Sequence, residues 1–393
     1  MRRKRGVISL VAIFAATAVL WVLAGLTPAQ AQTETVLYSF RDADSGDGGQ
    51  PYAGLVKRSN FYGTTVNGGA YGAGTVYRVT AKGKETVFYS FGSQSGDGLN
   101  PYAGLVKDKT GNLYGTTFWG GAYGAGTVYR VTAKGKETVL YSFGSQSGDE
   151  YFPFGGLVMD KTGNLYGTTG VGGAYNLGMV YKVTPAGTET VLHSFQSQSG
   201  DGYYPYAGLV MDKTGNLYGT TYGGGAYGEG TVYKVAPAGT ETVLYSFGSQ
   251  AGDGANPFAG FIMDKKGNLY GTTDWGGTYG AGTVYKVTPA GTETILYSFG
   301  SQSGDGANPQ ACLVMDKTGN LYGTTYGGGA YGSGTVYKVT PAGIGTVLYS
   351  FGSQPGDGET PVAGLVMDKT GNLYGTTANG GAHGAGTVFK LMP

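Results

Sequence analysis

Short segments in which apolar and aromatic residues alternate with polar ones recur along the chain, and glycine-rich stretches separate them. One set of four such segments covers Tyr206–Asp212, Asn216–Tyr222, Thr231–Ala236 and Glu241–Phe247. They are rich in Val, Tyr, Thr and Leu and are bounded by turn residues, which is typical of strands. No stretch beyond the N-terminal segment has a helical period. The pattern predicts an all-β protein.

This set of four segments repeats with a constant period along the chain. Its most regular part is AGLVMDKTGNLYGTT, at Ala207–Thr221, and the tyrosine of this motif returns every 52 residues. A period of this size indicates a repeat architecture, in which each unit buries its core against its neighbours. Seven units are present, with the tyrosine at Tyr62, Tyr114, Tyr166, Tyr218, Tyr270, Tyr322 and Tyr374.

Four antiparallel strands in about fifty residues are typical of a β-propeller blade. The repeats open with Glu34–Phe40, which matches a fourth strand, and end with Gly386–Leu391, which matches a third strand. Pairing these two segments would complete the last blade and leave no open edge. We therefore predict a seven-bladed β-propeller with four antiparallel strands per blade, closed by the N-terminal strand on the C-terminal blade. Residues 32–393 would form this single domain.

The connections between the predicted strands are of two kinds. Short turns, Asp212–Asn216 and Ala236–Thr240 in the fourth unit, join the first strand to the second and the third to the fourth. Their Asp, Pro and Gly residues suit tight hairpin turns. The loops from the second strand to the third, and from the fourth to the next unit, are longer and rich in Gly, Tyr and Asp. In an up-and-down sheet these long loops share one face of the ring.

The first 31 residues differ from the repeats. Arg2–Arg5 is basic, Val7–Leu26 is almost wholly apolar, and Ala29–Ala31 offers small residues for cleavage. This order is that of a secretory signal peptide. We expect cleavage near Ala31 and a secreted, cell-surface or periplasmic protein without a membrane span in the mature chain. An uncleaved anchor is the alternative, because the apolar run approaches the length of a membrane span.

Charge and cysteine content narrow the choice of partners. The formal net charge is +1, and clusters of Lys and Arg are few, which argues against nucleic acid as a partner. Cys312 is the only cysteine, so no intramolecular disulfide can form. It occupies a position that holds glycine in the other six units, and we expect a small buried residue and not a catalytic thiol. A monomer is expected.

The motif GLVMDKTGNLYGTT followed by GGAYGxGTVYKVTPAGTE resembles the GloVer tandem repeats of exported bacterial proteins called choice-of-anchor proteins. The resemblance extends over residues 34–393. It implies an exported, surface-associated protein and brings no catalytic residues with it. Anchored members end in a sorting signal, whereas this chain ends at Met392-Pro393.

Candidate catalytic and metal-binding residues are scarce. His193 and His383 each replace a repeated tyrosine, lack metal-ligand spacing and are interpreted as structural. Each long loop before a new unit carries one Asp in an SGDG-like motif, which is expected to accept backbone hydrogen bonds in its own turn. The first such loop is richer, and Asp42, Asp44 and Asp47 form a weak candidate calcium site whose spacing departs from known calcium loops. No cofactor is predicted.

Positions that vary between units are more informative about a ligand site than those that repeat. The residues after each YGTT and before each proline differ, and several are aromatic. We predict a non-catalytic module that binds glycan or another surface protein there, although relaxed constraint on loops would also explain the variation. An extracellular hydrolase, lyase or lactonase acting at the channel mouth is the alternative; the channel-facing slots, Tyr52, Tyr102, Phe154, Tyr206, Phe258, Gln310 and Val362, hold no acid or histidine. The predicted ligand-binding residues are Phe118, Trp119, Tyr203, Tyr204, Tyr222, Trp275 and Tyr326.

Overall fold

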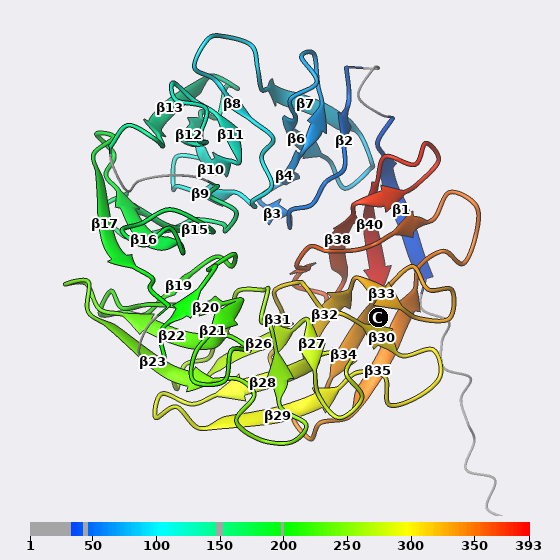
Figure 1. The fold of residues 1–393 in the computed structure, drawn as a ribbon. Helices are drawn as coiled ribbons and strands as arrows, with labels where there is room; N and C mark the ends of the chain where they lie inside the picture. The colour runs from blue at the N-terminus through cyan, green and yellow to red at the C-terminus, as the bar shows by residue number, and fades with distance from the viewer. Residues whose placement is uncertain (1–32, 42–45, 147–151, 198–199) are drawn as a thin grey trace, which may run out of the picture.

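The computed structural model describes residues 33–41, 46–146, 152–197 and 200–393. It shows seven four-stranded antiparallel sheets arranged in a ring, which is the predicted seven-bladed β-propeller (Figure 1). The described residues contain no helix, and thus none long and apolar enough to cross a membrane. The signal peptide predicted for residues 1–31 lies outside the described residues.

In each blade the strands follow one another from the channel outward. The innermost strands are β3 Val56–Lys57, β9 Val106–Lys107, β14 Val158–Met159, β19 Val210–Met211, β25 Ile262–Met263, β31 Val314–Met315 and β37 Val366–Met367. The second strands are β4 Phe61–Thr65, β10 Leu113–Thr117, β15 Leu165–Thr169, β20 Leu217–Thr221, β26 Leu269–Thr273, β32 Leu321–Thr325 and β38 Leu373–Thr377.

The outer half of each blade has longer strands. The third strands are β6 Thr75–Val79, β12 Thr127–Val131, β16 Met179–Val183, β22 Thr231–Val235, β28 Thr283–Val287, β34 Thr335–Val339 and β40 Thr387–Met392. The outermost strands are β7 Glu85–Ser90, β13 Glu137–Ser142, β17 Glu189–Ser194, β23 Glu241–Ser246, β29 Glu293–Ser298, β35 Gly345–Ser350 and β1 Thr33–Ser39.

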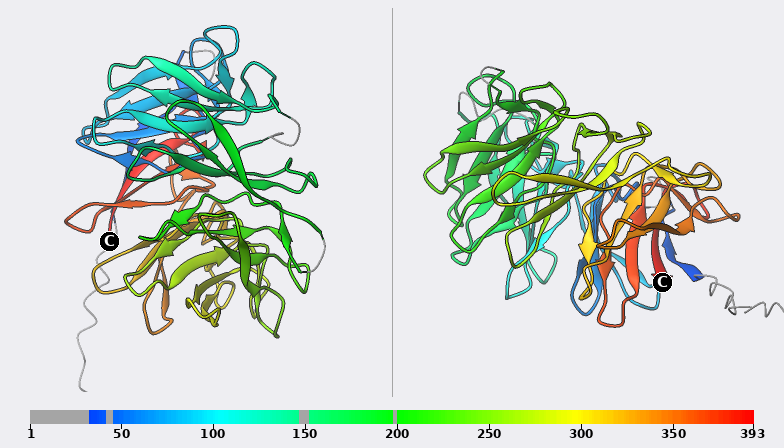
Figure 2. Two further views of the ribbon diagram at one scale, coloured as in Figure 1. Left: turned by 90° about the vertical axis from the view of Figure 1, so that its left-hand side faces the viewer. Right: turned by 90° about the horizontal axis from the view of Figure 1, so that it is seen from below.

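Ring closure follows the prediction. The last blade has the order β37-β38-β40-β1, so its outermost strand comes from the N-terminal end of the repeats. The antiparallel pairing runs from Thr33 opposite Met392 to Ser39 opposite Thr387. Figure 2 shows the blue β1 beside the red C-terminal strand. Closure removes the two sheet edges that an open array would expose.

The structure differs from the prediction in two respects. The innermost strand of the fourth blade was predicted as Tyr206–Asp212, but only Val210–Met211 pairs with its neighbour. The long loops also form two-stranded ribbons that were not predicted. These are β2 Gly48–Gly49 with β5 Asn67–Gly68, β8 Gly98–Leu99 with β11 Trp119–Gly120, β18 Gly202–Tyr203 with β21 Gly223–Gly224, β24 Gly254–Ala255 with β27 Trp275–Gly276, β30 Gly306–Ala307 with β33 Gly327–Gly328, and β36 Gly358–Glu359 with β39 Asn379–Gly380.

The repeated motif owes its regularity to the hydrogen bonds of its aspartate. In the fourth blade the Asp212 carboxylate accepts hydrogen bonds from the backbone N–H of Thr214 and Asn216 and from the hydroxyl of Tyr218. Gly215 has φ +89°, which only glycine adopts easily. The D-x-T-G-N-L-Y pattern thus encodes a turn and the start of the second strand together.

The core lies between the blades. The phenylalanine that follows each outermost strand packs edge-on against the aromatic ring of the third strand in the next blade, as Phe91 does against Tyr129 with ring centroids 4.9 Å apart. The second-strand threonines add a polar link, and Thr64 Oγ1 donates to the carbonyl of Ala103 in the next blade. Thr376 makes the same bond to Ala53 and so joins blade seven to blade one.

Candidate functional site

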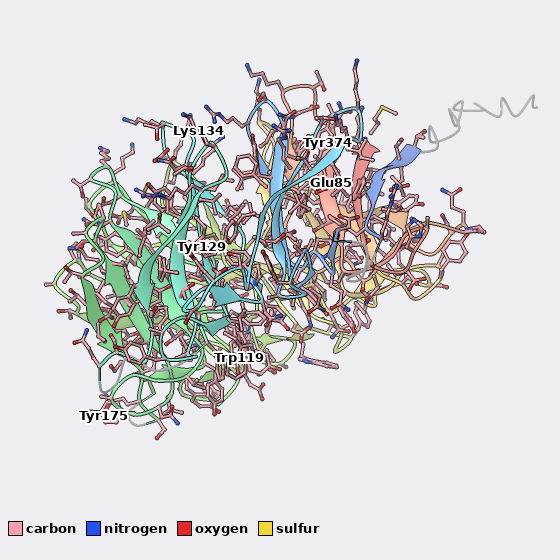
Figure 3. The ribbon with its side chains drawn as sticks, turned by 90° about the horizontal axis from the view of Figure 1, so that it is seen from above. Glu85, Trp119, Tyr129, Lys134, Tyr175 and Tyr374 are labelled. Atoms are coloured by element: carbon pink, nitrogen blue, oxygen red, sulfur yellow. The ribbon has the colours of Figure 1, made fainter. Side chains whose placement is uncertain are left out.

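The two faces of the ring carry different structures. Figure 3 shows Trp119 and Tyr175, both from loops between second and third strands, at one end of the molecule. Lys134 from a short turn and Tyr374 from the start of β38 lie at the opposite end. The long loops therefore share one face, as predicted, and this face is called the long-loop face below.

The central channel opens toward the long-loop face as a cavity of about 230 Å³. The residue after each proline lines it, followed by the next two residues of each blade. The cavity narrows at a ring formed by six glycines and Cys312. A Cβ atom added to Gly260 would lie 2.8 Å from the carbonyl oxygen of Gly208, so the close approach of neighbouring blades requires glycine here.

A second cavity, of about 530 Å³, adjoins the first on one side of the channel. It shares four lining residues with the channel cavity, so the two spaces adjoin. We call the seven residues that line it the aromatic mouth. They are Phe118, Phe154, Tyr206, Tyr222, Phe258, Asp274 and Gln310.

Aromatic rings from blades two to five contact one another around this mouth. Phe118 stacks on Phe152 with centroids 4.3 Å apart, and Phe154 meets Phe258 edge-on at 5.6 Å. Tyr206 contacts both Phe258 and Tyr222. Offset and edge-to-face pairs of this kind stabilise one another beyond the effect of burial alone, so the rings form a fixed surface.

The mouth is asymmetric although the fold is a near-perfect repeat. The slot after each proline holds an aromatic residue in blades one to five but Gln310 in blade six and Val362 in blade seven. Blade seven also has Ala378 where blade two has Phe118. The aromatic ring of this slot is therefore interrupted at blades six and seven, which makes the channel entrance asymmetric.

Asp274 is the only carboxylate among the described residues that line the mouth. It is 6% exposed and its carboxylate oxygen accepts a hydrogen bond of 3.2 Å from the side-chain amide of Gln310. Desolvation raises the pKa of Asp274, and hydrogen bonds from Gln310, Asn308 and Trp275 oppose this rise. The pair presents a polar group that can accept and donate hydrogen bonds within an aromatic enclosure.

The structure brings together some of the predicted ligand-binding residues and separates others. Phe118 and Tyr222 line the mouth, and Tyr326 lines the channel cavity. Tyr204 stacks on Tyr206 at 5.9 Å, and Tyr203 packs edge-on against Tyr204. These five residues lie in or beside the mouth.

The two predicted tryptophans lie outside the cavity, in the two-stranded ribbons. Trp119 in β11 is 42% exposed and contacts Phe118 and Phe152 edge-on. Trp275 in β27 is 51% exposed. Both therefore lie at the rim of the mouth, outside its lining. Trp119 contacts the lining directly, through the ring of Phe118.

Sequence reasoning missed Asp274 and Gln310 as site residues, and it missed the role of Phe154, Tyr206 and Phe258. The sequence did mark both residues as unusual. Asp274 is the one acidic residue among the seven that follow YGTT, and Gln310 follows five aromatic residues at the position after proline. Their proximity was not visible, since it depends on how blade five packs against blade six.

The other candidate residues from the sequence mostly take part in hydrogen bonds that hold their own loops. Asp97 accepts hydrogen bonds from the N–H groups of Ser93 and Gly98, as expected, and also from the hydroxyl of Tyr89. Of the weak calcium candidates, Asp42 and Asp44 lie outside the described residues, whereas Asp47 binds Tyr38 and the N–H of Gly48. His383 is exposed in its loop.

The expected burial of Cys312 is wrong. The residue is exposed, because its side chain points into the channel at the ring where the other blades have glycine.

Comparison with solved structures shows the fold in other proteins at low sequence identity. The extracellular domains of two Bacteroides thetaiotaomicron proteins, each described as a hybrid two-component system, align with TM-scores of 0.56 and 0.60 at 14% and 11% identity. Each alignment covers 92% of this chain but only 41% and 39% of the other chain. A puromycin-hydrolysing peptidase of Mycobacterium tuberculosis aligns with a TM-score of 0.52 at 13% identity, over 84% of this chain and 50% of that one.

No curated protein matches the sequence. The model of the Gloeobacter/Verrucomicrobia repeat family matches residues 22–225 and 208–393. These two matches together include all seven tyrosine motifs, in agreement with the resemblance seen in the repeats. The chain therefore belongs to the Gloeobacter/Verrucomicrobia repeat family.

Proposed function

We propose that this protein is an exported, non-catalytic binding module that holds a glycan in the aromatic mouth. The observation that carries the proposal is the asymmetric enclosure of five aromatic rings around the Asp274–Gln310 pair. Its volume of about 530 Å³ falls in the range of small-molecule sites, about 300–1,000 Å³.

A sugar ring matches both parts of this surface. Its C–H faces pack against aromatic rings, which present large apolar areas with little conformational freedom to lose. Its hydroxyl groups can donate to the carboxylate of Asp274 and accept from the amide of Gln310. A site whose buried polar groups are paired by the ligand's own hydroxyls discriminates strongly against ligands that lack them. The adjoining channel cavity offers room for a further sugar unit or substituent.

A protein partner is the other binding mode open to the long-loop face. Stable protein interfaces bury about 800 Å² on each side, and the exposed rim residues Trp119, Trp275 and Tyr326 would contribute to one. The concave mouth favours the glycan, because a protein surface would have to insert a side chain to fill it.

Export rests on the N-terminal segment of basic residues followed by an apolar run, which directs secretion in other proteins. The extracellular domains among the structural neighbours share the fold, and an external location suits a glycan ligand. We propose that the protein acts as a monomer.

Catalysis is the second candidate function, and Asp274 is the observation that favours it. A buried carboxyl with a raised pKa can serve as a general acid. Glycosidases generally need two carboxyl groups about 5–10 Å apart, and Asp274 has no second carboxylate beside it among the described residues of the mouth. Binding without turnover is therefore the better-supported function.

The test is a glycan array followed by calorimetry with the best ligand. Phe118→Ala and Asp274→Asn should each weaken binding roughly tenfold or more, which corresponds to about 1.4 kcal/mol. Tyr175→Ala is the matched control, because Tyr175 is an exposed aromatic of the same face that lies outside the mouth. Equal affinity in the mouth variants, or product formation from the bound glycan, would reject the proposal.

A further inference from the structure

A repeated contact fixes the end of each outermost strand to the loop that follows it. A tyrosine in the strand donates its hydroxyl hydrogen to the aspartate of the loop, at 2.8 Å for Tyr89 and Asp97 and at 2.7 Å for Tyr245 and Asp253. The same bond joins the other described pairs, Tyr38–Asp47, Tyr297–Asp305 and Tyr349–Asp357.

Blade three departs from this rule. His193 in β17 replaces the tyrosine, and its Nε2 atom lies 3.5 Å from Oδ2 of Asp201. Asp201 occupies the same position as the loop aspartates of the other blades, because its carboxylate accepts hydrogen bonds from the backbone N–H groups of Gln196 and Gly202. Glu241, at the start of β23 in blade four, completes a group whose three ligand atoms lie within 4.8 Å of one another.

Two of the three side chains present an atom that lacks a hydrogen-bond partner. Nε2 of His193 and Oε1 of Glu241 are both buried, and neither has a hydrogen-bond partner among the described residues. An unpartnered glutamate oxygen recurs in other blades, as at Glu85 and Glu293, but among the described residues the unpartnered imidazole nitrogen occurs only here. A bound ion would satisfy both atoms. The two carboxylates carry two negative charges when both are ionised, which a divalent cation would balance.

The spacing suits a transition metal. Zinc binds imidazole nitrogen and carboxylate oxygen at about 2.0–2.2 Å, so two ligands of a tetrahedral site lie roughly 3.4 Å apart. The 3.5 Å between His193 Nε2 and Asp201 Oδ2 is close to this value. One imidazole with two carboxylates favours zinc over calcium, because calcium takes six to eight oxygen ligands.

We propose that His193, Asp201 and Glu241 form a zinc site between blades three and four. The three ligands come from the outermost strand of blade three, the loop that joins the two blades and the outermost strand of blade four. The ion would link two neighbouring outer strands, with water in its fourth position. It would replace, in this blade, the tyrosine–aspartate hydrogen bond of the others.

Calorimetric titration of the EDTA-stripped full chain with zinc chloride tests the proposal. The expected result is one equivalent bound, with an upward shift of the melting temperature, since a ligand that binds the native state stabilises it. His193→Tyr restores the residue of the other blades; it should fold normally and lose both effects. His383→Tyr, which removes the other histidine, should change neither.

The repeat offers a gain-of-site experiment as well. In blade four Tyr245→His would place an imidazole beside Asp253 and Glu293, by analogy with blade three, and should add a second equivalent of bound zinc. In blade five Tyr297→His should add none, because Gly345 occupies the position of the glutamate. Absence of zinc binding by the stripped protein, or undiminished binding by His193→Tyr, would overturn the assignment.

Discussion

The side-chain amide of Gln310 in blade six donates a hydrogen bond of 3.2 Å to Oδ1 of Asp274 in blade five. The two residues stand 36 positions apart in the sequence and meet because the inner segment of one blade packs against the loop of the blade before it. Asp274 is 6% exposed, so each hydrogen bond to its carboxylate bears directly on its protonation state.

Replacing Gln310 by leucine should therefore raise the pKa of Asp274 further. The substitution removes a hydrogen bond that favours the charged carboxylate, while the desolvation that raises the pKa remains. We expect a loss of stability at neutral pH of about 1.5–3 kcal/mol, the usual contribution of a hydrogen bond to a charged group. Chemical denaturation at pH 7 measures this, and NMR titration of the Asp274 carboxyl measures the pKa.

The control for this prediction is the same substitution in an Asp274→Asn background. Without the charge, Gln310→Leu should cost much less, and the difference between the two backgrounds is the coupling energy of the pair. Equal costs in both backgrounds would mean that the amide packs beside Asp274 without supporting its charge.

Buried glutamates at the blade interfaces should make the stability depend on pH. Glu137 is 6% exposed, and both its carboxylate oxygens lack a hydrogen-bond partner among the described residues. Desolvation, followed by the charge of Asp97, raises the pKa of Glu137 to about 7. Because the folded-state pKa lies above the ordinary glutamate value of 4.5, the folded protein binds the proton more tightly than the unfolded chain does. Stability therefore falls as the pH rises from about 4.5 to 7.

Glu137→Gln should remove this contribution. The variant should match the unsubstituted protein near pH 4.5 and exceed it at pH 8 by on the order of 1–2 kcal/mol, less than the full linkage value of about 1.4 kcal/mol per pKa unit because nearby solvent screens the charge. Melting temperatures across this pH range provide the measurement. Glu359→Gln, at an exposed loop position, should leave the profile unchanged. A Glu137→Gln profile parallel to that of the unsubstituted protein would contradict the prediction.

Much of the fold could be predicted from the sequence because each strand and turn depends on local residues. The second, third and fourth strands of the fourth blade, β20, β22 and β23, fall within the predicted segments. The inner strand was predicted too long. Tyr206, Ala207 and Gly208 line the channel, where the blades converge, and only Val210–Met211 pairs with β20.

The candidate site could be predicted only in part. Variable aromatic positions pointed to the long-loop face and included Phe118 and Tyr222, which do line the mouth. Asp274 and Gln310 lie in different repeat positions of different blades. The repeat period predicts which residues are equivalent but not which residues of two adjacent blades touch, so their contact could not be predicted. The same holds for His193 and Glu241, which belong to neighbouring blades.

Ring closure gives a third prediction. Deleting residues 34–40 removes most of β1 and the buried Phe40, whose ring packs edge-on against Tyr77 at 4.9 Å. The deletion leaves β40 as an open edge and exposes the core between blades seven and one. We expect a loss of several kcal/mol, since burying one such phenylalanine alone contributes about 3–5 kcal/mol, together with self-association through the free edge.

The measurement combines thermal melting with light scattering, and a synthetic peptide of residues 33–41 serves as the control. The peptide should restore the melting temperature when added to the shortened protein, because it can pair with β40 as β1 does. A shortened protein that melts like the complete one would show that β1 does not hold the ring closed.

The last prediction separates the two rim tryptophans. Trp119 and Trp275 occupy equivalent positions in β11 and β27. Trp119, however, packs edge-on against Phe118 and Phe152, with ring centroids 5.2 and 4.5 Å away.

Fluorescence quenching and substitution test this difference. In a protein that begins at residue 32, and so lacks Trp21, acrylamide should quench the fluorescence of both tryptophans. It should quench Trp275 more strongly, since Trp275 is 51% exposed and Trp119 is 42% exposed. Glycine stands at this position in blades four and six, but Trp275→Gly also removes the side-chain hydrogen bond that lowers the pKa of Asp274. It should therefore cost about 1.5–3 kcal/mol and raise the pKa of Asp274. Trp119→Gly should cost about 1–2 kcal/mol, because it removes two aromatic contacts worth about 0.5–1.5 kcal/mol each, and it should weaken glycan binding by loosening Phe118. Single-tryptophan variants resolve the two signals. Equal quenching of both, or a Trp119→Gly variant that melts and binds like the unsubstituted protein, would show that Trp119 does not support the mouth.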